Sequence, residues 1–434
     1  MIKAKRTWDP LYGRIELTDF EFDLISLPEV QRLRYVRMCN INSLLVAGAS
    51  EISRFEHTLG VMHLAQQWIK AHGLPESEGK DLVAAAVLHD IQTGPFGHWM
   101  QYVLEDNTVE EATFIHGDLS HGWRSAYHQN TLASSSFSGK PFRGPAFLSG
   151  RWETVASLIR GEGKHGPLIA GTMDLDNIDN VVRLAYHVGV TEEADRSIPL
   201  TLAHRMSIDR GELVLQANAT PAVVRWQEIR SRLYDLLLHD WAEFSAKAML
   251  TKAIEVAISY DLVGADSWVM TDSGFLDFLE QKGVGEAQEV REYVRRLRRG
   301  DLYEPVALYE SPAVEKYVSL SSTEVKLSIE SGLSLALKGR GIKPLVHFIL
   351  DKGKTRRGIK VRLAETGERL TIGETSSRLL AGLFVSSSRL SDSDRQALDY
   401  EFRSILINEH VVFDIVPIPD PMGALPPGAQ LSLI

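Results

Sequence analysis

Residues 85–98, AAVLHDIQTGPFGH, carry an apolar helical run directly onto a histidine and an aspartate, His89 and Asp90. The stretch DLVAAAVLHDI is apolar on nearly every side of a helix, which predicts a central, buried helix. A carboxylate at the end of such a helix costs on the order of several kcal/mol unless it is paired or binds a cation. The negative end of the helix dipole adds to this cost. His89 and Asp90 therefore predict a functional site at the end of a buried helix.

The composition is that of an ordinary globular protein. The chain has 434 residues, of which 44% are hydrophobic and 24% charged, so it can form a large core and more than one domain. Its single cysteine, Cys39, excludes an internal disulfide and fits a reducing compartment. The sequence has no run of about 18 apolar residues, and its N-terminus lacks the apolar stretch of a signal peptide. We therefore expect a cytoplasmic protein without membrane spans.

The net charge of −10 limits the partners that this chain can attract. It argues against broad affinity for nucleic acid or anionic membranes. It also means that a phosphate-bearing substrate needs local positive charge or a metal ion in order to bind. Eight of the 14 histidines fall between His57 and His128, and we expect the chemistry of the protein to reside there.

Helical patterns dominate up to about residue 335, with short strands predicted only at RMSIDRGELVLQ. The helix RFEHTLGVMHLAQQWIKAH should end at Gly73, and a continuous helical pattern runs over 223–260. Beyond that point PLVHFIL, GIKVRLAE, RLTIGE and AGLFVS are short and rich in branched residues, which predicts strands. We expect a mainly α fold, with a helical core and helical extension over 1–335 and a small α/β domain with a Pro-rich tail over 336–434.

A further histidine and a further aspartate are candidate partners of the His89-Asp90 pair. His57 lies on an apolar helix face, where a histidine is more often a core residue than a ligand. The helix MDLDNIDNVVRLAYHVGV places several polar residues within about 60° of one another. These residues are Asp176, Asn180, Arg183 and His187. The stripe could be solvated, but it is poor in the Lys and Glu that fill solvated faces, which favours a lined cavity.

Two imidazoles and two carboxylates make a mixed nitrogen and oxygen donor set. Such a set suits Mn, Fe, Zn or Mg, with open positions left for water. A metal of this kind acidifies bound water and polarises a phosphoryl oxygen, which also solves the charge problem of an acidic protein. The residues alone therefore indicate a metal-dependent hydrolase that acts on phosphoesters or phosphoanhydrides.

The order H…HD…D, in RFEH, LHD and MDLD, resembles the HD-domain phosphohydrolases. More narrowly, PLYGRIELTDFEFDLISLPEVQRLR, GASEISRFEHTLGV and LHDIQTGPFGH resemble the deoxynucleoside triphosphate (dNTP) triphosphohydrolase branch. That branch includes the human SAM-and-HD enzyme and bacterial dGTPases, and the resemblance covers roughly residues 9–310. It implies an all-helical HD-domain core, a homo-oligomer, and cleavage of a dNTP to deoxynucleoside and inorganic triphosphate.

The resemblance also implies roles for individual residues. The implied ligands of a divalent metal (Mn, Mg, Fe or Zn) are His57, His89, Asp90 and Asp176. Asp176 would also help to activate water, and His116, with His121 as its nearest competitor, would act on the leaving oxygen or the α-phosphate. His98 would line the phosphates and assist catalysis. The implied substrate contacts are Arg54, His98 and Asn180, together with Arg183 from the polar stripe.

The positions that face substrate depart from the family pattern, although the metal set is complete. This chain has Gln92-Thr93 where the family has Gly-His, and Met38-Cys39-Asn40 where the family has Gln-Leu-Gly. It also has Asn177 and Asn180 in place of a Lys and a Tyr, and Leu184 in place of an acidic residue. Two alternatives therefore remain open: an HD-type phosphatase or phosphodiesterase that acts on another nucleotide, and a nucleotide-sensing protein without turnover. The basic runs REYVRRLRRG and DKGKTRRGIKVR are read as solvated faces, with contact to a nucleotide effector as the alternative.

Overall fold

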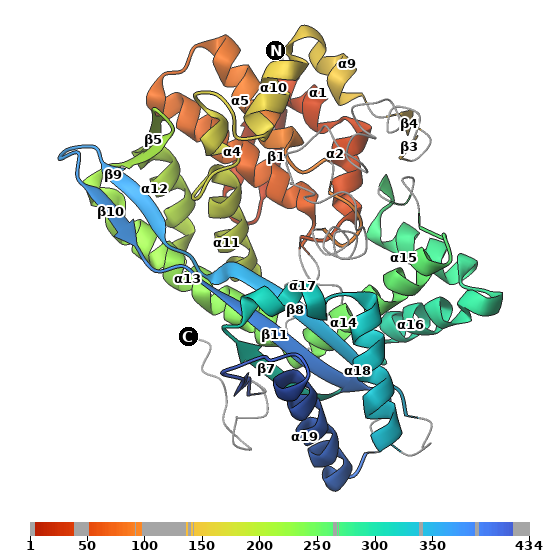
Figure 1. Cartoon of the computed structure of the whole chain (residues 1–434). Helices are drawn as coiled ribbons and strands as arrows, with labels where there is room; N and C mark the ends of the chain where they lie inside the picture. The colour runs from red at the N-terminus through yellow and green to blue at the C-terminus, as the bar shows by residue number, and fades with distance from the viewer. Residues whose placement is uncertain are drawn as a thin grey trace.

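The computed structural model is mainly helical, with small β-sheets, as the sequence predicts (Figure 1). It describes residues 5–38, 52–91, 93–97, 136–137, 140–141, 143–263, 267, 269–337, 342–386 and 390–419. None of the helices in these ranges combines the length and the apolar character needed to cross a membrane.

A set of helices around one apolar core forms the upper part of the molecule in Figure 1. They are α1 (Asp19–Ile25), α2 (Pro28–Arg32), α4 (Arg54–His72), α5 (Glu76–Leu88), α9 (Gly144–Leu148), α10 (Trp152–Ile159), α11 (Leu175–His187) and α12 (Ile198–Arg205). Helix α4 packs against α5, α11 and α12, and α5 also packs against α10. This packing buries every residue from Leu82 to Leu88, so the prediction of a central buried helix is confirmed.

Local capping sets the limits of α4. Its N-cap, Ser53, accepts a hydrogen bond from the backbone N–H of Glu56, and it ends at Gly73, whose φ is 64°. That left-handed conformation favours glycine, so the predicted end of the helix is confirmed. An antiparallel hairpin of β1 (Lys5–Asp9) and β2 (Gly13–Leu17) precedes this core.

A second group of helices continues the chain. They are α13 (Thr220–His239), α14 (Trp241–Ser259), α15 (Asp272–Lys282) and α16 (Gln288–Arg299). The prediction of one continuous helix over 223–260 is wrong, because Asp240 adopts an extended conformation and caps α14 by accepting from the N–H of Glu243. An aspartate oxygen that binds the first free N–H groups competes with helix continuation.

Two four-stranded sheets complete the fold. The first has the order β10 (Arg369–Ile372), β9 (Ile359–Leu363), β6 (Glu212–Leu215), β5 (Met206–Asp209), with β6 and β9 parallel. The second is antiparallel, with the order β12 (Val416–Pro417), β7 (Glu304–Ser311), β11 (Ser376–Val385), β8 (Pro344–Arg356). The strands predicted at RMSIDRGELVLQ and at the four later stretches are confirmed.

Each sheet draws strands from both sides of residue 335. The division into 1–335 and 336–434 therefore stays a prediction. The remaining elements are α17 (Tyr317–Leu320), α18 (Thr323–Ala336), α19 (Asp392–Asn408) and the short pair β3 (Ser136–Phe137) and β4 (Lys140–Pro141). In Figure 1 the hairpin of β9 and β10 runs alongside α13 and reaches β5 and β6. Because β9 pairs with β6, this hairpin links the C-terminal part of the chain to the helical core.

Candidate metal centre

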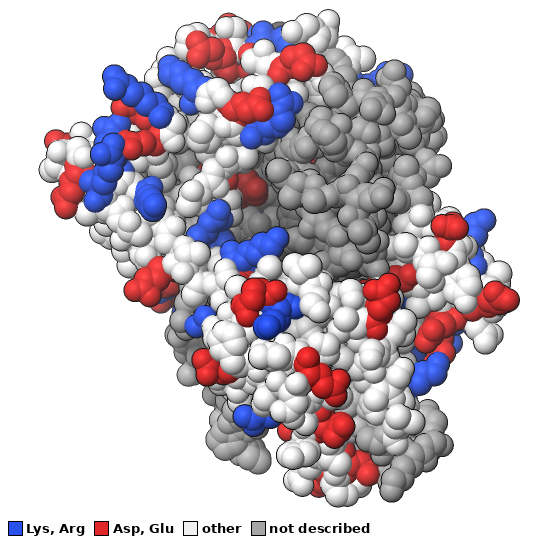
Figure 2. Space-filling model, in the orientation of Figure 1, with Lys and Arg blue, Asp and Glu red and all other residues white. Residues whose placement is uncertain are grey.

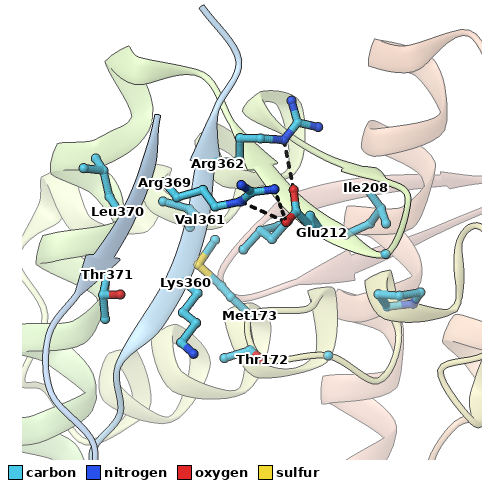
Figure 3. Close-up of a pocket in the computed structure, with 14 residues that line it drawn as sticks. Thr172, Met173, Ile208, Glu212, Lys360, Val361, Arg362, Arg369, Leu370 and Thr371 are labelled. Atoms are coloured by element: carbon cyan, nitrogen blue, oxygen red, sulfur yellow. Dashed lines mark hydrogen bonds and ion pairs between the residues drawn. The ribbon is translucent and has the colours of Figure 1, made fainter. Parts of the chain in front are cut away.

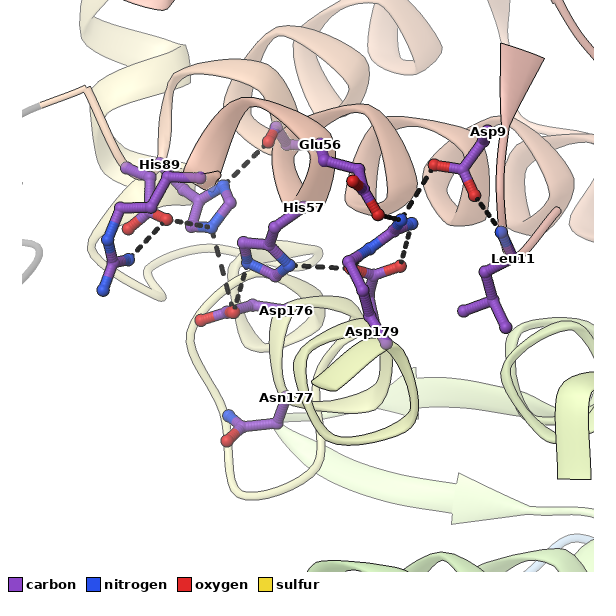
Figure 4. A network of polar contacts seen from close by, with 12 residues as sticks. Asp9, Leu11, Glu56, His57, His89, Asp176, Asn177 and Asp179 are labelled. Atoms are coloured by element: carbon purple, nitrogen blue, oxygen red, sulfur yellow. Dashed lines mark hydrogen bonds and ion pairs between the residues drawn. The ribbon is translucent and has the colours of Figure 1, made fainter. Parts of the chain in front are cut away.

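Three of the predicted ligands gather where α4 meets the end of α5. One donor atom from each of His57, His89 and Asp90 can be chosen so that all lie within 4.8 Å of one another. The two imidazole rings meet edge to face, with their centroids 5.3 Å apart. All three side chains are buried. Figure 4 shows His57 and His89 both pointing toward Asp176, in the first turn of α11.

The fourth predicted ligand joins this group from α11. Asp174 caps that helix by accepting from the N–H of Asn177, which places Asp176 in the first turn. Asp176 Oδ1 lies 2.9 Å from His57 Nε2 and 3.9 Å from His89 Nε2. Ligands held at about 2.1 Å around one ion are separated by roughly 3 to 3.5 Å. The spacing of these atoms therefore fits a shared cation.

His89 provides the sharpest test of whether the residues fit a metal. Its Nδ1 lies 2.8 Å from the carbonyl oxygen of Ala86 and so carries the proton, which leaves a lone pair on Nε2. Among the described residues, the buried Nε2 has no hydrogen-bond partner, while carboxylate oxygens of Asp90 and Asp176 lie 3.7 and 3.9 Å away. A buried, unsatisfied acceptor is costly and rare. A divalent cation satisfies this nitrogen and both carboxylates, so the residues fit such an ion.

Asp90 is held in place by two neighbours. Arg54 Nη1 donates to Oδ2 at 2.7 Å, and the Thr93 hydroxyl donates to Oδ1 at 3.0 Å. A second nitrogen of Arg54 lies 3.3 Å from the carbonyl oxygen of Met38. Arg54, which the sequence predicts to contact nucleotide, is thus buried against the candidate metal ligand Asp90. Thr93 stands where the family pattern has a histidine, and its hydroxyl helps to orient the carboxylate of Asp90.

A buried carboxylate that the sequence analysis missed orients His57. Asp179 Oδ2 accepts from His57 Nδ1 at 2.7 Å and from Arg183 Nε at 2.9 Å, and Tyr12 donates to its other oxygen at 2.6 Å. This contact fixes the imidazole so that Nε2 faces Asp176, as a second carboxylate commonly does behind a metal-bound histidine. The available signal was the spacing of three residues from Asp176 and four from Arg183 on one helix.

The charges of this network are strongly coupled. Burial acts to raise the pKa of Asp179, but Arg183 and His57 hold it well below its ordinary value. Burial acts to lower the pKa of His57, but Asp176 and Asp179 raise it to about 9. Burial lowers the pKa of His89, which favours its neutral form. The two carboxylates thus favour the charged form of His57, while burial keeps His89 in the neutral form that can donate a lone pair.

Replacing Asp179 with asparagine is expected to weaken metal affinity by about 10- to 100-fold, because an outer carboxylate fixes ligand orientation and basicity. The measurement is competition with a chelator of known affinity. Asp195 is the matched control, because it is also buried and pairs with an arginine, Arg225, rather than with His57 or Arg183. Equal metal affinity in Asp179→Asn and Asp195→Asn would contradict the role given to Asp179.

The polar stripe of α11 packs against α4 rather than facing solvent. Arg183 is completely buried and forms ion pairs with Asp9 at 2.9 Å and Glu56 at 2.7 Å in addition to its contact with Asp179. His187 Nε2 lies 2.7 Å from the same oxygen of Glu56. The predicted substrate contact Arg183 therefore lies in the layer behind the metal centre. Three other predicted site residues, His98, His116 and His121, lie outside the described residues.

A separate cavity of about 400 Å³ opens between residues 167–173 and the hairpin of β9 and β10. Figure 3 shows Lys360 pointing toward the loop that carries Thr172, while Glu212 accepts from both Arg362 and Arg369. Glu212 and Asp209 thus balance two arginines next to this cavity, one of which, Arg362, belongs to the basic run DKGKTRRGIKVR. In the other basic run, Arg295 and Arg298 pair with Glu280. Several of the basic charges in these runs are therefore balanced locally.

Comparisons with known proteins agree with this geometry. A family model described as HD domain matches residues 54–129. The SAMHD1 homolog of Dictyostelium discoideum, a deoxynucleoside triphosphate triphosphohydrolase, is 33% identical over 318 residues, which cover 68% of this chain and 58% of that protein. The uncharacterized protein YwfO of Bacillus subtilis is 27% identical over 258 residues, or 57% of this chain and 55% of that protein.

Two further matches define the extent of the likeness. Deoxynucleoside triphosphate triphosphohydrolase SAMHD1 of Xenopus laevis is 27% identical over 236 residues, or 43% of this chain and 35% of that protein. This chain thus matches between 35% and 58% of the length of these three relatives. A crystal structure of a phosphohydrolase from Bacteroides thetaiotaomicron has the same fold at 17% identity, with a TM-score of 0.62 over 87% of this chain and 99% of that one. The chain belongs to the HD-domain phosphohydrolases and is distantly homologous, at 27–33% identity, to dNTP triphosphohydrolases of the SAMHD1 type.

Proposed function

We propose that this protein is a metal-dependent nucleotide phosphohydrolase that cleaves dNTPs to deoxynucleoside and inorganic triphosphate. The observation that carries the proposal is the buried Nε2 of His89, which lies beside Asp90 and Asp176 and has no hydrogen-bond partner in the described ranges. The names of the relatives in Dictyostelium and Xenopus support the choice of dNTP. A homo-oligomer, a nucleotide effector and a cytoplasmic location belong to the same proposal.

The proposed roles follow from where the side chains lie. His57, His89, Asp90 and Asp176 would hold the metal, which when bound supplies an acidified water and polarises the phosphoryl oxygen. Asp176 is the most open of the four, with its side chain 25% exposed. Its Oδ1 faces His57, and its Oδ2 would accept a proton from the attacking water.

Other proposed roles concern the substrate. His98 would bind the phosphates, and His116 would deliver a proton to the leaving oxygen. Arg54 holds Asp90 and would act on the phosphates from behind that carboxylate. Arg183 is assigned to positioning Asp179, since its contacts are with buried carboxylates.

The test is a screen of all dNTPs and NTPs with Mn, Mg, Fe and Zn, with the products identified by chromatography. We expect deoxynucleoside and triphosphate from at least one dNTP and none from a protein carrying both His89→Ala and Asp90→Ala. Release of orthophosphate or of a linear dinucleotide would instead identify a phosphatase or a phosphodiesterase. Metal-loaded protein that releases no phosphate compound from any nucleotide would overturn the proposal.

A further inference from the structure

The cavity of about 400 Å³ beside the hairpin of β9 and β10 is a candidate binding site that the proposed function does not use. Its volume lies within the range of roughly 300 to 1,000 Å³ that is typical of small-molecule sites. No candidate metal ligand is among the described residues that line it. We call residues 167–173 its loop wall, and β9 and β10 its hairpin wall. Its apolar lining residues are Pro167, Met173, Ile208, Leu213, Val361 and Leu370.

The hairpin wall is fixed at both ends by hydrogen bonds. At its base, the side-chain amide of Gln227, on α13, donates to the carbonyl oxygens of Arg357 and Ile372, each at 2.7 Å. At the other end, the N–H of Ala364 donates to the carbonyl oxygen of Leu215 at 2.9 Å, which extends the parallel pairing of β9 with β6. The position of this wall therefore does not depend on a ligand.

The loop wall is also fixed by its own contacts. The N–H of Gly171 donates to Asp174 Oδ2 at 2.6 Å, and Asp174 in turn caps α11. A Cβ at Gly171 would lie 2.4 Å from the carbonyl oxygen of Pro167, so this tight turn excludes a side chain at that position. Because both walls are held in place, the cavity is preformed, and a ligand binds there with little cost of ordering.

The charges around the cavity are balanced except for one. Arg362 pairs with Asp209 and Glu212, and Arg369 pairs with Glu212. Figure 2 shows basic and acidic side chains next to one another in the region where β5, β9 and β10 lie in Figure 1. Lys360 forms no ion pair with any residue that the structure describes, and Figure 3 shows it pointing toward the loop wall. Three cations and two carboxylates thus leave one positive charge.

This single surplus charge selects the class of ligand. A carboxylate carries one negative charge and matches it, whereas a phosphate monoester carries about 1.5 to 2 at pH 7 and a polyphosphate carries more. The apolar lining residues favour a ligand with an apolar body, because contact with that body removes their surfaces from water. The chemistry of the cavity therefore fits a small acid that has one charged end and one apolar end.

We propose that this cavity binds a small amphipathic carboxylate, whose charged end pairs with Lys360 and whose apolar body packs against Leu213 and Leu370. The site is separate from the metal centre, and the inference does not rest on the proposed function. The ligand would touch the loop wall, which leads directly into the helix that carries Asp176.

Calorimetric titration of the full chain tests the proposal with two probes, octanoate and 2-naphthoate, which offer a flexible and a planar apolar body. At least one of them should bind, and octan-1-ol, which has no charge, should bind more weakly than octanoate. Binding of neither carboxylate would overturn the proposal. Tighter binding of inorganic tripolyphosphate, weakened by Lys360→Gln, would also overturn it, because the site would then select a multiply charged anion.

Lys360→Gln is expected to weaken binding of the carboxylate about five- to tenfold. The ammonium is exposed before binding, so its contribution is smaller than that of a buried charge. Lys352→Gln is the matched control, because Lys352 is also an exposed strand lysine, on β8, and does not line the cavity. It should bind within twofold of the unmodified protein. Equal binding by both variants would remove Lys360 from the site and overturn the proposal.

A second variant tests the place of the apolar body. Thr371 lies opposite Lys360 in the register of β9 and β10, lines the cavity and is exposed. Thr371→Phe should therefore fill part of the cavity without changing the melting temperature of the free protein. The rise in melting temperature on adding the carboxylate should disappear in this variant. An intact rise would place the carboxylate elsewhere on the protein and contradict the proposal.

Discussion

Replacing His89 with alanine is expected to leave the purified protein without metal and to reduce nucleotide hydrolysis by about 10³-fold or more. The reason is geometric: Nδ1 donates to the carbonyl oxygen of Ala86, while Nε2 faces two carboxylates and has no hydrogen-bond partner in the part of the chain that the structure describes. Without the Nε2 nitrogen of His89, a cation held by Asp90 and Asp176 has one ligand fewer. The rate falls because water without a metal has a pKa about 9 units higher than water bound at a catalytic metal site.

His72→Ala is the control for this substitution. His72 also has its Nδ1 close to a backbone carbonyl, that of Trp68 at 2.9 Å, and it stacks on the ring of Trp68. It lies at the far end of α4 from His57. Elemental analysis of the purified proteins should find metal in His72→Ala and not in His89→Ala. Metal at full stoichiometry in His89→Ala would exclude His89 as a ligand.

The meeting of His57, His89, Asp90 and Asp176 could be anticipated because each lies on a helix, or directly after one, that the sequence pattern predicts. His89 and Asp90 are adjacent and end a helix that is apolar all round, so their position in the core follows from the burial of that helix. His57 and Asp176 occupy amphipathic helices, whose apolar stripes fix which face turns inward. Local periodicity therefore carries most of the information about these four side chains.

The contacts among the buried residues that support the candidate ligands could not be predicted in the same way. Tyr12 reaches Asp179 across 167 positions of the chain, and Arg183 reaches Glu56 across 127. A helical wheel gives the direction of a side chain but not the element that will face it. The parallel pairing of β6 with β9 is unpredictable for the same reason, because short strands carry no signal that selects a distant partner.

Alanine at Gly60 is expected to be among the most disruptive single substitutions in the core. A Cβ at this position would lie 2.1 Å from Asp179 Oδ1 and 2.2 Å from Arg183 Nη2. Both atoms are completely buried, and both belong to the ion pair that orients His57. The pair would have to separate or shift, and disruption of a buried pair costs about 3 to 5 kcal/mol.

The intrinsic helix preference acts in the opposite direction and is too small to compensate. Alanine stabilises a helix interior by roughly 0.5 to 1 kcal/mol relative to glycine, so Gly60→Ala should lose at least about 2 kcal/mol of unfolding free energy in urea and bind metal less tightly. Gly79→Ala on α5 is the matched control, because the atoms nearest to its Cβ would belong to the flexible side chain of Ile69, the first of them at 3.3 Å. That variant should be as stable as the unmodified protein or slightly more so. If both variants unfold at the same urea concentration, Asp179 and Arg183 are not held against α4 as tightly as their contacts indicate.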